Sequence, residues 1–168
     1  MKEILVIDTS ILCVWLNVPG KETCGTYDNL WDKARVKKVL DKEEKRGTRF
    51  VLPLAAIIET GNHIAQSQKS WECATALCDI IRKSIDSASP WIAFSQQSVL
   101  WNSENLRRLA DEWPDYAKTK LSIGDMTIKT IADFYTEARY NVQILTGDAG
   151  LKAYEHKQAE LVPRRQRS

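Results

Sequence analysis

Short uninterrupted apolar runs alternate with longer amphipathic segments along this chain. Residues 4–7 are Ile-Leu-Val-Ile, and a run without polar alternation is typical of a strand that is buried on both faces of a parallel sheet. Similar short runs at residues 50–52, 91–95 and 142–145 predict three further strands. Residues 159–162 form a candidate edge strand. The sequence therefore predicts a sheet of four to five strands.

Apolar residues at helical spacing predict that the intervening segments are helices. The predicted helices span residues 10–17, 29–46, 54–68, 70–85, 103–113, 122–140 and 151–156. Asp28 or Asn29 is the expected cap of the second helix, and residues 21–27 are expected to form a loop over the strand ends. A strand, a long helix and a strand in this order form a right-handed crossover. The pattern predicts an α/β fold.

Length and composition fit one domain. The chain has 168 residues, of which 43% are apolar and 27% charged, as in an ordinary globular protein with one sizeable core. We expect one domain over residues 1–163, followed by a basic tail at residues 164–168. The longest uncharged apolar run, residues 50–58, is too short to span a membrane, and no secretion signal is present. A cytoplasmic protein without a membrane partner is expected, and its four cysteines match no zinc signature.

Basic residues are concentrated in two places. The formal net charge of +2 is too small to indicate a polyanionic partner by itself. Residues 28–50 hold eight basic and five acidic side chains, and the tail adds Arg164, Arg165 and Arg167. These segments either guide a nucleic acid or are solvated faces.

Four acidic residues stand where the predicted elements begin or end. Asp8 and Asp148 directly follow predicted strands, and Glu59 and Asp125 lie in helices that are entered from the same side of the sheet. Ligands of open α/β sheets bind at this edge. Each Asp also has a simpler interpretation. Asp8 and Asp148 can cap the following helix, and Asp125 can form a capping box with Ser122.

Convergence of these four carboxylates would favour a metal ion. No lysine or arginine is adjacent to any of them in the sequence, so the carboxylates would repel one another and raise each other's pKa. A divalent cation removes that repulsion, and oxygen ligands without a His/Cys set suit Mg²⁺ or Mn²⁺. Such a site can activate water for attack on a phosphodiester.

These residues resemble the motifs of PIN-domain nucleases, which include the virulence-associated protein C type toxins of toxin–antitoxin pairs. The similar pieces are Val6-Ile7-Asp8-Thr9-Ser10-Ile11-Leu12, Ile57-Ile58-Glu59, the stretch from Asp125-Met126-Thr127-Ile128 to Ile131-Ala132, and Leu145-Thr146-Gly147-Asp148. They occur in the family's order and cover residues 4 to about 150. The chain is longer than the family's small toxins, and Gly61-Asn62-His63 departs from their pattern.

The resemblance implies a three-layer α/β/α sandwich and a metal-dependent ribonuclease acting on RNA. It implies that Asp8, Glu59, Asp125 and Asp148 hold Mg²⁺ or Mn²⁺. Thr9, Ser10 and Thr146 would be the hydroxyl neighbours that orient a carboxylate or a water. It also implies a homodimer and, for a toxin, a cognate antitoxin.

Several alternatives stay open at this point. His63, one turn after Glu59, either faces the site or is a structural histidine. Gly61 inside a predicted helix costs about 1 kcal/mol relative to alanine, which predicts that another group approaches the backbone closely there. A DNA nuclease of the same fold is an alternative function, because carboxylates that act on phosphates do not select the sugar. A catalytically silent PIN-like module is another, although all four acids are present.

Overall fold

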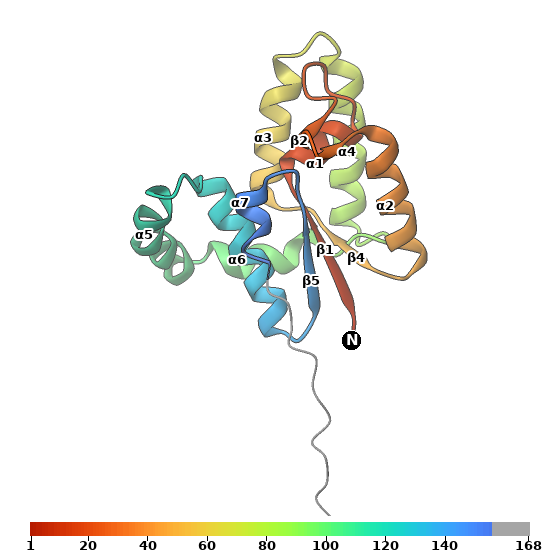
Figure 1. Cartoon of the computed structure of the whole chain (residues 1–168). Helices are drawn as coiled ribbons and strands as arrows, with labels where there is room; N and C mark the ends of the chain where they lie inside the picture. Colours follow the sequence, from red (N-terminus) through yellow and green to blue (C-terminus); the bar gives the residue numbers. More distant parts are fainter. Residues whose placement is uncertain (156–168) are drawn as a thin grey trace, which may run out of the picture.

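The computed structural model describes residues 1–155, which form an α/β fold around a small parallel sheet (Figure 1). Strand β1 (Glu3–Ile7) lies at the centre, between β4 (Arg49–Val51) and β5 (Asn141–Leu145), and both neighbours run parallel to it. The helices are α1 (Thr9–Trp15), α2 (Lys33–Lys45), α3 (Leu54–Ala65), α4 (Ser70–Ile85), α5 (Ser103–Ala117), α6 (Ile123–Glu137) and α7 (Ala149–Lys152), with a 3₁₀ helix η1 (Phe94–Trp101).

Successive residues of β1 are buried on opposite faces of the sheet. Leu5 and Ile7 belong to one core with residues of α1, α2 and α4. Ile4 and Val6 belong to a second core with residues of α6 and with Leu151 of α7. Side chains of a strand alternate between its two faces, so helices cover the sheet on both faces. This explains why the predicted strand contains no polar alternation.

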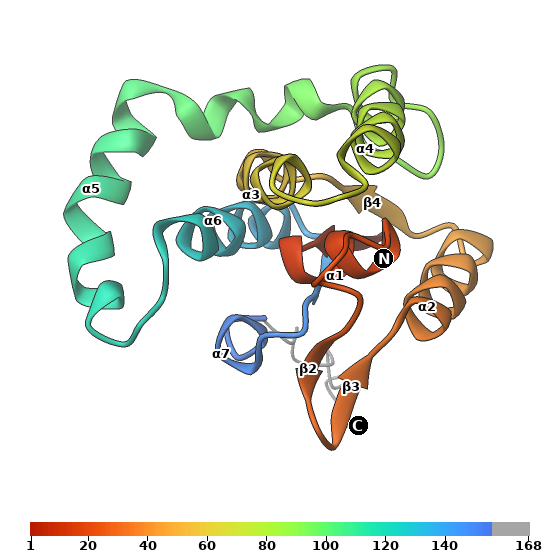
Figure 2. The ribbon, with the colours of Figure 1, turned by 90° about the horizontal axis from the view of Figure 1, so that it is seen from above.

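The order of the strands places Asp8 at a topological switch point, where the chain continues to opposite sides of the central strand. The chain passes from β1 to β4 on one side and later returns to β5 on the other side. Because all three strands are parallel, their carboxyl ends lie at one edge, which is where ligands bind in open α/β sheets. Asp8 directly follows the central strand at this edge. Figure 2 looks down on the molecule, with α1 near the centre and η1 and α5 running around the outside of α3 and α6.

The predicted second helix begins too early. Cys24–Thr26 (β2) and Asn29–Trp31 (β3) instead form an antiparallel hairpin, which occupies part of the predicted loop at residues 21–27. Helix α2 starts only at Lys33, where the Oδ1 atom of Asp32 accepts a hydrogen bond from the backbone N–H of Arg35 at 2.8 Å. The prediction of Asp28 or Asn29 as the cap was wrong because the actual capping bond forms a few residues later.

The prediction of a strand at residues 91–95 was also wrong. Only Trp91 forms a bridge to Phe50, and the chain then enters η1. The amide Nε2 of Gln97 donates a hydrogen bond to the carbonyl oxygen of Leu52 at 2.7 Å. A side chain, and not a strand, therefore binds the backbone just beyond β4. Within residues 1–155 the parallel sheet has three strands instead of the four to five that the sequence predicted.

Three further expectations concern single features. An added Cβ atom at Gly61 would meet nothing within 4 Å, so the predicted close approach to the backbone is absent there. The candidate strand at residues 159–162 and the basic tail lie outside the described residues. Within residues 1–155, no helix has the length and apolar character needed to cross a membrane.

Candidate functional site

All four predicted carboxylates line one pocket at the carboxyl edge of the sheet. The pocket has a volume of about 300 Å³. Asp8 reaches it from the end of β1, Glu59 from α3, Asp125 from the first turn of α6, and Asp148 from the loop after β5. Residues that are up to 140 positions apart in the sequence thus share one cavity.

Asp8 is held in place by two hydroxyl groups. Its side chain is buried, and Ser10 Oγ and Thr146 Oγ1 each donate a hydrogen bond to Asp8 Oδ2 at 2.8 Å. Burial raises the pKa of Asp8, and these two hydrogen bonds oppose that rise. Asp8 occupies the N-cap position of α1, but its side chain accepts no capping hydrogen bond. The carboxylate is held mainly by the two hydroxyls, and the backbone N–H groups of Thr9 and Ser10 also lower its pKa.

Glu59 is fixed from two sides. Thr9 Oγ1 donates a hydrogen bond to Glu59 Oε2 at 3.0 Å. The other oxygen lies against the start of α6, because a Cβ atom added to Gly124 would clash with Glu59 Oε1. Gly124 thereby leaves space for the carboxylate between α3 and α6.

Asp125 combines the two roles that its sequence context allowed. Its backbone N–H donates to Ser122 Oγ at 3.0 Å, so Ser122 caps α6 as the sequence predicted. Its side chain also lines the pocket. Partial burial raises the pKa of Asp125, and the negative charges of Asp8 and Asp148 raise it further. The carboxylates are thus close enough to interact electrostatically.

The loop after β5 is tied to the same hydroxyls. The backbone N–H of Gly147 donates to Ser10 Oγ, and that of Asp148 donates to Thr146 Oγ1, both at 3.0 Å. Asp148 also caps α7, since its Oδ1 atom accepts a hydrogen bond from the Gly150 N–H at 2.8 Å. Ser10 and Thr146 therefore couple the position of Asp8 to that of Asp148.

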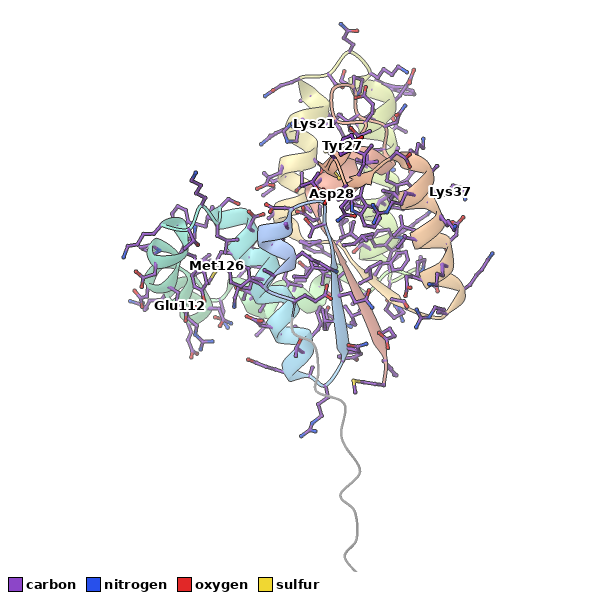
Figure 3. The ribbon with its side chains drawn as sticks, in the orientation of Figure 1. Lys21, Tyr27, Asp28, Lys37, Glu112 and Met126 are labelled. Atoms are coloured by element: carbon purple, nitrogen blue, oxygen red, sulfur yellow. The ribbon has the colours of Figure 1, made fainter. Side chains whose placement is uncertain are left out.

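The pocket contains further residues that sequence analysis did not assign to the site. Lys21, Thr23 and Cys24 line the pocket, as does Cys13 of α1. Figure 3 shows Lys21, Tyr27 and Asp28 at the end of the molecule toward which β1 runs. The prediction that residues 21–27 lie over the strand ends agrees with this placement. The basic charge of Lys21 was the feature of the sequence that could have assigned this residue to the site.

Two thiols, Cys13 and Cys24, also line the pocket. Burial raises the pKa of Cys13 to about 11 and also raises the pKa of Cys24. Because thiolates are the forms that bind metals, burial disfavours the metal-binding form of both groups. Cys24 Sγ instead packs against the loop, 2.6 Å from where a Cβ atom on Gly147 would lie.

His63 lines the same pocket as the four acids. It follows Glu59 by one turn of α3, so the two side chains share a face of that helix. Of the two interpretations that the sequence left open, this placement agrees with a histidine that faces the pocket.

The donor set fits a hard cation, although the carboxylates are not gathered into a compact cluster. Within residues 1–155, no group of three or more His, Cys, Asp and Glu side chains is arranged to hold a metal ion. In the same part of the chain, none of the four carboxylates forms an ion pair with lysine or arginine. Mg²⁺ is commonly bound by one or two carboxylates and several waters. Four acidic side chains around a small pocket are compatible with that mode of binding.

Comparison with models of known protein families, with curated proteins and with solved structures finds no match for this chain. The functional assignment therefore depends on the geometry of the pocket.

Proposed function

We propose that this protein is a metal-dependent endoribonuclease with a PIN-like α/β/α fold. The observation that supports the proposal is the convergence of four carboxylates, from four separate elements, on one pocket in which no lysine or arginine of residues 1–155 forms an ion pair with them. Two of these carboxylates have raised pKa values because of burial, and negative neighbours add to the rise at Asp125. A cation would relieve this unfavourable arrangement.

In this proposal, Asp8, Glu59, Asp125 and Asp148 hold Mg²⁺ or Mn²⁺. When bound, such an ion lowers the pKa of a coordinated water and neutralises charge on the phosphodiester. The protein supplies orientation. Ser10 and Thr146 fix the carboxylate of Asp8, and Thr9 fixes that of Glu59.

The remaining polar residues of the pocket have positions suited to substrate binding. Lys21 is exposed and lines the pocket, so its ammonium group can bind a phosphate next to the one that is cleaved. His63 can donate a hydrogen bond to the phosphate backbone of the same RNA. The substrate of the proposed reaction is RNA, and a cognate antitoxin and a homodimer remain predictions from the family resemblance.

Cleavage by purified protein tests the proposal. We expect cleavage of a mixed RNA with Mg²⁺ or Mn²⁺ and none with excess EDTA. Asp8→Asn should lower the rate by at least about a hundredfold, because it removes a charge from the metal site at nearly constant volume. A gel time course with both RNA and single-stranded DNA measures the rate and the choice of sugar.

Asp41→Asn is the matched control. Asp41 lies on α2, where it pairs with Lys37 and lines none of the pockets described for residues 1–155. The Asp41→Asn variant should cleave RNA at the wild-type rate. Cleavage by Asp8→Asn at the wild-type rate would count against the proposed site, and faster cleavage of DNA would favour a DNA nuclease.

One observation favours a second candidate, a catalytically silent PIN-like module. The carboxylates of residues 1–155 do not form a ready-made metal cluster, as would suit a protein that binds RNA or protein without cutting it. Isothermal titration with Mn²⁺ separates the two. Heat of binding that disappears in Asp8→Asn supports the enzyme, whereas no detectable binding supports the silent module.

A further inference from the structure

A second and larger pocket adjoins the carboxylate pocket. It has a volume of about 800 Å³ and lies between the β2–β3 hairpin, the start of α2, the end of β5 and α7. Asp148 lines both pockets. A ligand that extends from the carboxylates past Asp148 on the side of the hairpin can therefore reach this second pocket.

The second pocket contains a planar cation held on an aromatic ring. The guanidinium carbon of Arg35 lies 3.7 Å from the centre of the Trp31 ring, and both residues line the pocket. Arg35 Nη1 also donates a hydrogen bond to the carbonyl oxygen of Leu30 at 2.7 Å. The guanidinium plane is thus fixed in orientation, while the side chain remains half-buried. Single-stranded RNA is bound by stacking of bases on aromatic rings and on arginine planes.

Arg35 is also the cation of this pocket that is available to a ligand. Lys152, the other basic residue that lines it, pairs with Glu155 and donates a hydrogen bond to the carbonyl oxygen of Ile144. Within residues 1–155, Arg35 forms no ion pair. A nucleotide supplies both features that Arg35 can bind, a flat base and a negative phosphate.

The geometry points to this second pocket as the binding site for a nucleotide of single-stranded RNA next to the scissile phosphate. The base stacks on the Arg35–Trp31 pair, and the exposed amide of Asn29 lies within the same pocket to contact its polar edge. The inference rests on the proposed nuclease function for the position of the scissile phosphate. It assigns the hairpin, which the family motifs do not include, to substrate binding.

Binding of a short fluorescein-labelled single-stranded RNA in EDTA tests this site without cleavage. We expect Arg35→Lys to weaken binding roughly tenfold, because lysine keeps the charge but loses the plane on which a base stacks. Asn29→Asp should also weaken binding severalfold, since it adds a negative charge at constant size. Arg82→Lys is the matched control. Arg82 lies on α4, pairs with Asp79 and lines no pocket described for residues 1–155, so its affinity should not change.

The outcomes separate this site from the proposed function. Wild-type affinity in both Arg35→Lys and Asn29→Asp would overturn the site even if the protein cleaves RNA. Binding that depends on both residues, in a protein that cleaves nothing, would retain the site and remove the nuclease. Circular dichroism shows whether Arg35→Lys is folded. If that variant is unfolded, the affinity of Asn29→Asp for the RNA tests the site instead. Tighter binding of the DNA of the same sequence would overturn the assignment to RNA.

Discussion

Asp8 illustrates how a residue of the proposed site opposes stability. The residue is only 5% exposed, and burial raises the pKa of its carboxylate. A raised pKa in the folded state means that folding favours the neutral acid. The corresponding contribution to stability is present below the ordinary pKa of aspartate and is lost as the pH rises through the folded-state pKa. At neutral pH this contribution is reduced, so the burial of Asp8 lowers the free energy of unfolding there relative to acidic pH.

Asp8→Asn should consequently raise the melting temperature at pH 7 in EDTA by a few degrees. Asparagine is neutral, and its amide oxygen can still accept the hydrogen bonds from Ser10 and Thr146. Differential scanning calorimetry measures the change. Asp148→Asn, at an exposed position, is the control and should shift the melting temperature less. A lower melting temperature for Asp8→Asn would show that its charge is compensated in the folded protein.

The place of each acid in its strand or helix was predictable from the sequence, but the packing around Glu59 was not. Asp8 follows an apolar run and Asp125 lies in phase with a buried stripe, and both patterns are local. The contact between Glu59 and the position of Gly124 joins two helices that are far apart in the sequence. Local periodicity contains no information about such a contact.

At the scale of elements, the hairpin is the feature that the sequence concealed. Trp31 fits the apolar phase of a helix, yet it is buried in a strand. Pairing with Cys24 and the backbone conformation of Gly25, whose φ is 91°, decide the outcome. The turn Tyr27-Asp28 also lacks the Asn-Gly type of sequence that usually marks a two-residue hairpin loop. Pairing within the hairpin therefore overrides the helical pattern.

The contact between α3 and α6 can be tested by replacing Gly124 with alanine. Gly124→Ala should reduce RNA cleavage severalfold, because the new methyl group displaces Glu59 Oε1 from its place beside α6. The change in stability should be small, since the displaced atom belongs to a flexible side chain and alanine favours a helix. Cleavage rates and thermal melts of the purified variants measure both effects.

Gly61→Ala is the internal control for this prediction. An added Cβ atom at Gly61 meets nothing within 4 Å, and the residue lies inside α3, two positions after Glu59. Alanine should raise the free energy of unfolding by roughly 0.5–1 kcal/mol and leave cleavage unchanged. Equal cleavage by the two variants would show that Glu59 does not need its contact with Gly124.

At the scale of the whole molecule, charge placement matters more than the net charge of +2. Several basic residues of the stretch at 28–50 already have partners. Lys37 pairs with Asp41, Arg46 with Glu43, and Arg49 donates hydrogen bonds to the carbonyl oxygens of Pro90 and Trp91. The count of basic residues therefore overstates the positive surface. The α/β class was predictable because the pattern of apolar residues shows which segments are buried. The pairing of these charged side chains was visible only in the structure.

Binding of RNA should depend on salt through the basic residues that line the two pockets. Neutralising each phosphate of a single strand contributes about −0.7 to the slope of log affinity against log salt. Lys21→Gln should therefore make that slope less steep by about 0.7, because Lys21 lies at the carboxylate pocket. Lys37→Gln is the control, since Lys37 lies on α2 (Figure 3), pairs with Asp41 and lines neither pocket. Fluorescence anisotropy across a KCl series, in EDTA, gives both slopes. An unchanged slope in Lys21→Gln would mean that Lys21 binds no phosphate. Salt-insensitive binding by the wild-type protein would mean that its basic residues are only solvated and do not contact the RNA.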